Sequence, residues 1–150
     1  MKKFSFSLDK VLKHRRMQAE LAQKDFLEAQ RNYDFEDDQL QQMIATKEAA
    51  KQQRVDVVQQ TQSWSATVEQ INQYLTGQDV RIQKQNESLL ELKKVVEAKR
   101  QILQEALTAA KIIEKLRETK KAEFFQEVAK AEQKETDEMS VMRFAKTEKM

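Results

Sequence analysis

Hydrophobic residues recur along the first half of the chain in alternating steps of four and three. The series runs from Leu8 to Leu75 without a slip, and fifteen of its twenty positions are apolar. A sustained repeat of 3.5 residues predicts a helix that supercoils against a partner helix. The positions of this seam are Leu8, Leu12, Arg15, Ala19, Ala22, Phe26, Ala29, Tyr33, Glu36, Leu40, Met43, Lys47, Ala50, Arg54, Val57, Thr61, Trp64, Val68, Ile71 and Leu75.

A second hydrophobic stripe follows Asp79. Between the two stripes lies Gly77, the only glycine in a chain that has no proline. Glycine just past a helix end takes the left-handed conformation at no steric cost, and Asp79 behind it is a good N-cap for a new helix. We therefore predict an all-α fold, a long antiparallel two-helix coiled-coil hairpin with its reversal near Gly77. The second stripe contains Ile82, Leu89, Leu92, Val96, Leu103, Ala106, Ala110 and Ile113.

The predicted hairpin is a single domain that spans residues 1–150. Its first arm covers residues 7–60, with Ser7 as the N-cap, and its tip covers residues 61–79. The second arm covers residues 80–140, and residues 141–150 form a frayed tail. Around residues 60–76 the composition shifts to Gln, Ser and Thr, which lowers helix propensity and predicts a break or a short helix there.

Charge supports a hairpin with its reversal near Gly77. In that register, residues whose numbers sum to about 154 face each other. The acidic residues within 34–38 then lie opposite the basic residues within 115–121, and the basic run Lys10–Arg16 lies opposite the acidic residues within 132–138. Each exposed pair contributes only about 0 to 1 kcal/mol, so these charges would set register more than stability.

Four charged residues interrupt the apolar seam of the first arm, namely Arg15, Glu36, Lys47 and Arg54. Two interpretations are open: their long side chains snorkel out of the seam, or they specify its register.

Two surface features also have two interpretations each. The basic run Lys10–Arg16 is either a solvated helix face or a site for phosphate or acidic protein. The apolar residues between Trp64 and Leu75, with Tyr74 off the seam, either cap the coiled coil or form a partner surface.

Composition narrows the class of function. Charged residues make up 35% of the chain and could indicate disorder, but the regular seam argues against it. The formal net charge of +2 gives no reason to expect nucleic-acid binding, and no segment is apolar enough for membrane insertion. His14 is the only histidine and cysteine is absent, so we expect no metal site and no cofactor. A two-helix structure also offers no enclosed pocket for catalysis, so we expect a non-enzymatic protein. Because a hairpin buries its own seam, we expect the isolated protein to be monomeric.

The two ends of the chain resemble the FliJ family, the small coiled-coil component of the bacterial flagellar type III export apparatus. The first similar segment is Phe4-x-Phe6-x-Leu8-x-x-Val11-Leu12-x-x-Arg15. The second arm adds Lys111-x-x-Glu114-Lys115-Leu116-Arg117-Glu118, then Glu135-x-Asp137-Glu138 and Phe144. Chain length and the less charged middle with Tyr74-Leu75 are similar too, so the resemblance spans the whole chain.

The resemblance implies a central stalk for a FliI-like hexameric export ATPase that also contacts a FlhA-like export gate protein. It implies a cytoplasmic protein, located at the cytoplasmic face of the inner membrane when assembled, with export chaperones as further partners. The implied gate contacts are Tyr74, Gln78, Arg81 and Gln85, of which the last three are more polar than the family pattern. The implied contacts to the ATPase ring are Phe4, Phe6, Leu8, Leu12, Arg15, Lys115, Arg117, Asp137 and Glu138.

Two alternatives stay open at this point. One is the equivalent stalk of a virulence type III secretion system, which genomic neighbourhood would distinguish. The other is an escort chaperone for export substrates, which would neither bind the ring at one copy per hexamer nor raise its ATPase rate.

Overall fold

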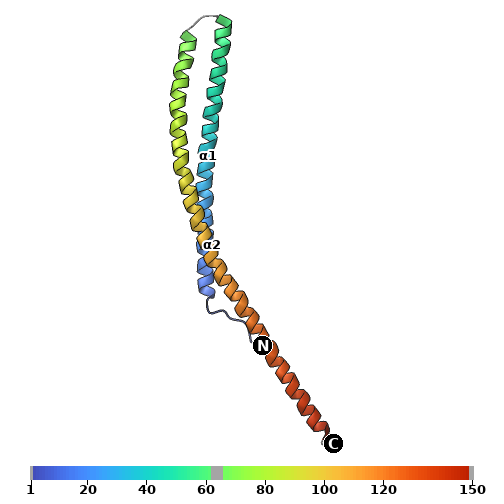
Figure 1. Ribbon diagram of the computed structural model, residues 1–150. Coiled ribbons are helices and arrows are strands. Elements are labelled where there is room, and N and C mark those ends of the chain that lie inside the picture. Colours follow the sequence, from blue (N-terminus) through green and yellow to red (C-terminus); the bar gives the residue numbers. More distant parts are fainter. Residues whose placement is uncertain (1, 62–65, 149–150) are drawn as a thin grey trace. The chain divides into compact units, whose positions relative to one another are not determined.

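Two long helices account for nearly all of the residues that the structure describes. The computed structural model describes residues 2–61 and 66–148. Helix α1 spans Asp9–Thr61 and helix α2 spans Ala66–Glu148 (Figure 1). Residues 2–8 precede α1 without forming a helix. The helices pack against each other in antiparallel directions, which confirms the predicted all-α hairpin.

The reversal does not lie near Gly77. Helix α2 is continuous through Gly77 and Asp79, while α1 ends at Thr61 and α2 begins at Ala66. The predicted position of the turn is therefore wrong, as is the division into a tip at residues 61–79 and an arm that starts at residue 80. The predicted end of the first helix near residue 60 is confirmed. Residues 62–65, including Trp64, lie outside the described part of the chain.

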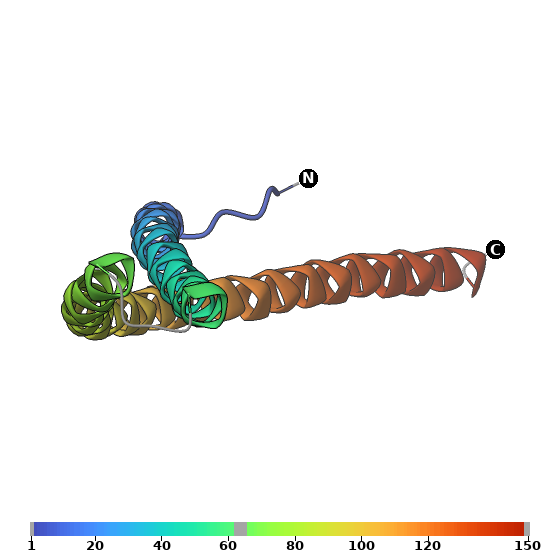
Figure 2. The same ribbon diagram turned by 90° about the horizontal axis from the view of Figure 1, so that it is seen from above.

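By its internal contacts the chain divides into two compact units. Unit one contains residues 1–20 and 105–150, and unit two contains residues 21–104. In unit two, the two helices run side by side to the end of α1 in both views (Figures 1 and 2). The Lys47 ammonium pairs with Asp79 at 2.6 Å, and the Arg100 guanidinium lies 5.8 Å from the centre of the Phe26 ring. In unit one, Arg16 pairs with Glu114 at 2.8 Å.

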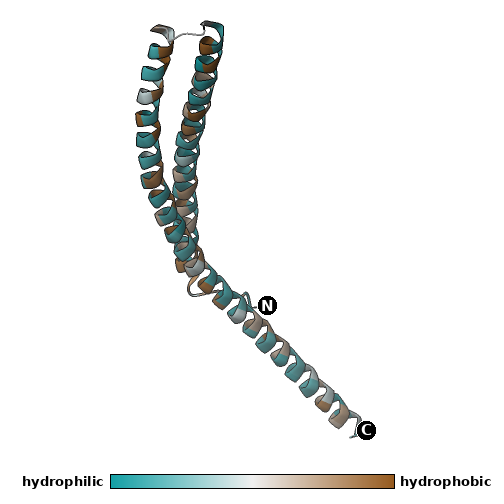
Figure 3. Cartoon of the chain, turned by 45° about the horizontal axis from the view of Figure 1, so that its top comes forward, coloured by the Kyte–Doolittle hydropathy of each residue, from teal (hydrophilic) through white to brown (hydrophobic). Residues whose placement is uncertain are grey.

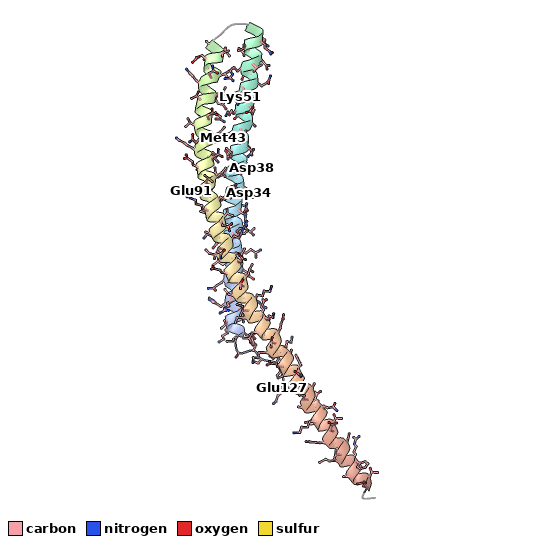
Figure 4. The ribbon with its side chains drawn as sticks, viewed as in Figure 1. Asp34, Asp38, Met43, Lys51, Glu91 and Glu127 are labelled. Atoms are coloured by element: carbon pink, nitrogen blue, oxygen red, sulfur yellow. The ribbon has the colours of Figure 1, made fainter. Side chains whose placement is uncertain are left out.

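These contacts define a register in which the paired residue numbers sum to about 125. The predicted sum of about 154 is wrong, and so are the charge pairings based on it. Glu36 lies beside Gln85, and the basic run at the start of α1 lies beside Ala109 and Glu114. Asp34 and Asp38 are exposed on α1 (Figure 4). Charge complementarity between the wrong segments was fortuitous, because a chain with 35% charged residues offers such matches in many registers.

The seam predicted for the first arm is confirmed in burial. All fifteen seam positions from Leu8 to Val57 are buried or half-buried. The same frame continues in α2 through Val68, Ile71, Leu75 and Gln78, and on to Ile113. Several buried positions are alanines, including Ala19, Ala22 and Ala50 in α1 and Ala110 in α2, which allow the helix backbones to approach closely. Apolar residues alternate with a larger polar surface along both helices (Figure 3).

The end of the chain also differs from the prediction of a frayed tail at residues 141–150. Helix α2 continues to Glu148, and residues 149 and 150 are not described. All side chains from Ala129 to Glu148 are exposed. The sequence has no proline or glycine here, so nothing local ends the helix even though its side chains are exposed.

Gly77→Ala is expected to raise the free energy of unfolding by about 0.5 to 1 kcal/mol, because glycine is costly inside a helix. An added Cβ would meet only the flexible guanidinium of Arg81, at 3.4 Å. Urea titration followed by circular dichroism measures the change. The matched control is Ala98→Gly, at an exposed position of the same helix, which should lower stability by a similar amount. A loss of stability in Gly77→Ala would contradict a regular helix at this position.

Candidate functional site

A cluster of apolar side chains in unit one joins the N-terminal segment to α2. Phe6, Leu12 and Ile113 are buried together. Phe4 and Leu8 pack against them, and the Phe4 ring lies 5.7 Å from the ring of Phe124 on α2. We call this set the terminal cluster. It brings together the four apolar residues of the predicted ATPase contact, but it uses their side chains mainly to hold the chain end on α2.

Arg117 ties the N-terminal segment to α2 by two contacts. Its guanidinium lies 5.6 Å from the centre of the Phe4 ring, and its Nε lies 3.5 Å from a carboxylate oxygen of Asp9. Arg117 stands on the packing face of α2, one turn beyond Ile113. The structure therefore gives this predicted ATPase contact a place within the terminal cluster. Lys115, two residues earlier, is exposed on the side of the helix.

Arg15 lies in the seam and bonds to the partner helix. Its Nη1 donates to the main-chain carbonyl of Ala109 at 2.9 Å. The neighbouring Arg16 donates from Nε to the Glu114 carboxylate at 2.8 Å, in a more exposed position. The two adjacent arginines thus have different environments, because position 15 falls on the seam and position 16 falls beside it.

Beyond the terminal cluster, α2 presents a segment with a mixed apolar and charged surface. We call residues 129–148 the terminal segment; Asp137 and Glu138 lie within it. They lie about 20 Å along the helix from Phe124, so the structure does not bring them into the terminal cluster. Asp137 accepts a hydrogen bond from Gln133 at 3.2 Å. The segment also exposes four large apolar side chains, those of Met139, Val141, Met142 and Phe144.

A shallow groove of about 860 Å³ lies where the terminal cluster meets the terminal segment. Lys2 borders it from the N-terminal segment, and Phe124 and Phe125 border it from α2. Its acidic wall includes Glu127, Glu132 and Glu135 on the same helix; Figure 4 labels Glu127. The groove combines aromatic faces with carboxylates, and aromatic residues are enriched at protein–protein interfaces.

Two glutamines in unit two reach across the seam to the backbone of α1. Gln78 is only 5% exposed, and its amide nitrogen donates to the carbonyl of Met43 at 3.0 Å and to the Thr46 hydroxyl at 2.9 Å. Gln85 repeats this one heptad later, donating to the Glu36 carbonyl at 2.8 Å and to its carboxylate at 2.6 Å. Because these amide donors reach fixed backbone acceptors, they favour one register of the two helices.

The four charged seam residues of α1 also make contacts across the seam to α2. Arg54 donates to the Asn72 side chain at 2.8 Å, and Lys47, Glu36 and Arg15 each contact a partner on α2. Of the two open interpretations, cross-helix contact that specifies register fits all four. Sequence reasoning missed the matching glutamines, although continuing the four-three frame from Leu75 would have placed Gln78 and Gln85 on the seam.

The predicted gate residues divide into Gln78 and Gln85, which face the seam, and Tyr74 and Arg81, which are exposed. Tyr74 is 41% exposed, and the Arg81 guanidinium lies 5.7 Å from the centre of its ring. Arg81 also donates to the Gln78 side-chain oxygen at 2.8 Å. Tyr74 and Arg81 thus form a surface patch that is anchored to the buried amide of Gln78. Gln85 is half-buried beside Glu36.

Two further kinds of site are absent from the described residues. No group of three or more His, Cys, Asp or Glu side chains there is arranged to hold a metal ion. Within the same residues, neither helix contains a stretch that is apolar enough to cross a membrane.

Comparison with known proteins gives one family and one related fold. The family described as flagellar FliJ protein matches residues 4–149. No curated protein matches significantly. Among solved structures, a Chlamydia trachomatis protein proposed as a homolog of YscO has a similar fold, with a TM-score of 0.64. The two sequences are 20% identical, and the match covers 93% of this chain and 94% of the other.

Proposed function

Because this chain belongs to the FliJ family of flagellar proteins, we propose that it is the central stalk of a hexameric export ATPase and couples that ATPase to the export gate. Membership of the family makes it a component of the flagellar and type III protein export apparatus. The stalk role goes beyond family membership. In this role the protein is non-enzymatic, works in the cytoplasm at the face of the inner membrane, and is mainly monomeric before assembly.

The terminal segment is the observation that carries this proposal. A helix whose side chains are all exposed normally keeps a polar surface, yet residues 129–148 expose Met139, Val141, Met142 and Phe144. Such side chains stay exposed at a cost in solubility unless a partner covers them. One helix is about 10–12 Å across, which suits insertion along the axis of a protein ring.

A stalk in a sixfold ring cannot match six subunits equally. It therefore contacts them through a few groups at its inserted end, and these need to be mobile or exposed. Lys115, Asp137 and Glu138 meet this condition, since all three are exposed. Phe4, Phe6, Leu8, Leu12, Arg15 and Arg117 support the same end from within, by fixing the N-terminal segment on α2.

Combined substitution of Met139, Met142 and Phe144 by glutamine should raise the concentration of the protein needed for half-maximal stimulation of the export ATPase by about tenfold or more. Burial of each side chain contributes on the order of 1 kcal/mol, and 1.4 kcal/mol corresponds to a factor of ten. Glutamine keeps helix propensity, so helical content should not change. A steady-state ATPase assay with the purified enzyme measures the effect.

The matched control replaces Leu21, Phe35 and Leu90 of unit two by glutamine. These side chains are each 61% exposed, against 61%, 72% and 67% for Met139, Met142 and Phe144. The control should stimulate the ATPase normally. If both triple variants behave alike, the terminal segment is not the contact and the stalk proposal loses its main support.

For the gate, we propose that Tyr74 and Arg81 make the direct contact and that Gln78 and Gln85 hold them in place. Tyr74→Ala should weaken binding to the cytoplasmic domain of the gate protein and leave thermal stability unchanged, because the ring is partly exposed.

Gln78→Ala should lower the free energy of unfolding by about 1 to 2 kcal/mol, since it removes two cross-helix hydrogen bonds. Isothermal calorimetry and urea titration separate the two effects. Unchanged gate binding in Tyr74→Ala would remove this surface from the proposal.

A stalk of a virulence type III system is the second candidate, favoured by the fold shared with the protein proposed as a YscO homolog. The same experiments apply with the corresponding ATPase, and the partner that responds identifies the system. An escort chaperone for export substrates would bind those substrates and leave the ATPase rate unchanged.

A further inference from the structure

The groove beside the terminal cluster has an aromatic lining. Phe124 and Phe125 are neighbours on α2, with ring centres 5.5 Å apart and planes inclined by 76°. The Phe4 ring extends this set from the N-terminal segment, at 5.7 Å from the ring of Phe124. Phe125 is 53% exposed, and Val128, one turn further along α2, is half-buried. The groove therefore offers an accessible aromatic surface that continues into an aliphatic one.

Arg117 shows which chemical group this aromatic set attracts. Its guanidinium lies 5.6 Å from the centre of the Phe4 ring, and its Nε lies 3.5 Å from a carboxylate oxygen of Asp9. One guanidinium thus contacts an aromatic face and a carboxylate together. Aromatic faces attract cations, arginine more often than lysine, because the ring carries negative charge over its face. Within the described residues, no arginine or lysine lies in this way over Phe124 or Phe125.

Carboxylates exceed cations around the groove. The described lining residues include Glu127, Glu132, Glu135 and, as the one cation among them, Lys2. None of the three carboxylates forms an ion pair with another residue of the described ranges 2–61 and 66–148. The local charge is therefore negative, which attracts a cationic group and repels the phosphates of nucleic acid or lipid.

We propose that this groove binds an arginine side chain of a partner protein, which stacks on Phe125 and pairs with the surrounding glutamates. The groove volume of about 860 Å³ lies within the range of about 300 to 1,000 Å³ that is usual for ligand pockets, so an arginine side chain fits. Arginine suits the groove better than lysine, because its planar guanidinium stacks on a ring and donates to carboxylates in pairs. This inference does not depend on the proposed stalk function, since the groove has the same chemistry whichever protein supplies the arginine.

The first test measures binding of short fluorescent peptides to the full chain by anisotropy. The peptides consist of glycine, serine and either arginine, lysine or citrulline, and have blocked ends. Citrulline keeps the shape of arginine without its charge, so the arginine peptide should bind at least about fivefold more tightly than the citrulline peptide, with the lysine peptide between them. Absence of binding, or equal affinity of the arginine peptide and either of the others, would overturn the proposal.

The second test removes the groove carboxylates. Combined Glu127→Gln, Glu132→Gln and Glu135→Gln should weaken binding of the arginine peptide by about tenfold, since each exposed charge pair contributes a factor of up to about five. The matched control makes the same three charge changes at exposed positions of α2 in unit two, namely Glu87→Gln, Glu91→Gln and Glu97→Gln. The control should bind normally. Equal losses in both variants would show attraction by overall charge and would overturn a site in the groove.

The third test separates the aromatic surface from the charge. Phe125→Leu keeps an apolar side chain but removes the ring, and should weaken binding of the arginine peptide by about threefold or more. Lys2→Ala should instead strengthen binding by about twofold, because it removes a like charge from the groove. Both side chains are exposed, so circular dichroism should show unchanged helical content. Unchanged affinity in Phe125→Leu, or weaker binding in Lys2→Ala, would contradict the proposed site.

Nuclear magnetic resonance of labelled valine methyl groups locates the bound peptide. The methyl signals of Val128, which lines the groove, should shift on addition of the arginine peptide. Val80 of unit two is 51% exposed, and its signals should stay in place. Shifts of equal size at both residues, or binding without a shift at Val128, would place the peptide elsewhere and overturn the proposal.

Discussion

Leu12→Ala is expected to lower the free energy of unfolding by about 2 to 4 kcal/mol, the range for a leucine truncated in a packed interior. Leu12 is only 3% exposed and packs with Phe6 and Ile113 in the terminal cluster. Few other buried residues hold the first turns of α1, so the loss should appear there first, as local opening. Urea titration measures the total, and hydrogen exchange should show faster exchange of the amides in residues 9–19.

The neighbouring Val11 provides the control for this experiment. Val11 is 38% exposed and lies outside the buried cluster, so Val11→Ala should cost less than about 1 kcal/mol. If both variants lose the same stability, or if Leu12→Ala loses less than Val11→Ala, the terminal cluster does not hold the N-terminal segment as described.

Arg15→Glu should cost about 1.5 to 3 kcal/mol, because it exchanges a charged donor for a carboxylate facing the carbonyl of Ala109. Arg16→Glu is the natural comparison. Its ion pair with Glu114 is exposed, with 54% of the Arg16 side chain accessible, and such pairs contribute only about 0 to 1 kcal/mol. Thermal unfolding of the two variants at equal ionic strength measures the difference.

The same pair of variants separates structural from functional effects. If Arg15 acts by positioning the terminal cluster, Arg15→Lys should recover stability and ATPase stimulation together. If stimulation stays low while stability recovers, Arg15 touches the ATPase itself. Equal stability of Arg15→Glu and Arg16→Glu would contradict the seam position given to Arg15.

The helical seam could be predicted from the sequence because burial follows the period of the helix. Every third or fourth residue from Leu8 to Val57 packs inward, and the apolar pattern reports this without any knowledge of the partner. The apolar pattern stays recognisable although several seam positions are alanines, since the alternating steps of four and three continue through them. Predicting two helices and their antiparallel pairing required no more than that pattern and a break between them.

The position of the break could not be read from the strongest local signal. A lone glycine is a common helix end, but inside a long helix it costs only about 1 kcal/mol, which packing on both sides of Gly77 offsets. The weaker signal, a run of Gln, Ser and Thr after residue 58, coincides with the end of α1 at Thr61. Because the two helices share one frame, periodicity could not choose between these positions.

Prediction of the candidate site was limited by the same error in register. The family resemblance implied Gln78 and Gln85 as gate contacts, with residue 78 in the predicted tip and residue 85 near the start of the predicted second arm. In the correct register both lie on the seam, and Gln78 is buried. For Phe6 and Arg15, the sequence alone could not tell a side chain that contacts a partner from one that holds the chain end, since both need the same residue types.

Titration of the purified protein into a purified hexameric export ATPase tests the central claim most directly. The steady-state ATPase rate and the composition of the complex, by native mass spectrometry, are followed together. A central stalk predicts that the rate rises and saturates at one copy per hexamer. A rate that stays unchanged, or binding that continues to six copies per hexamer, would contradict the stalk role.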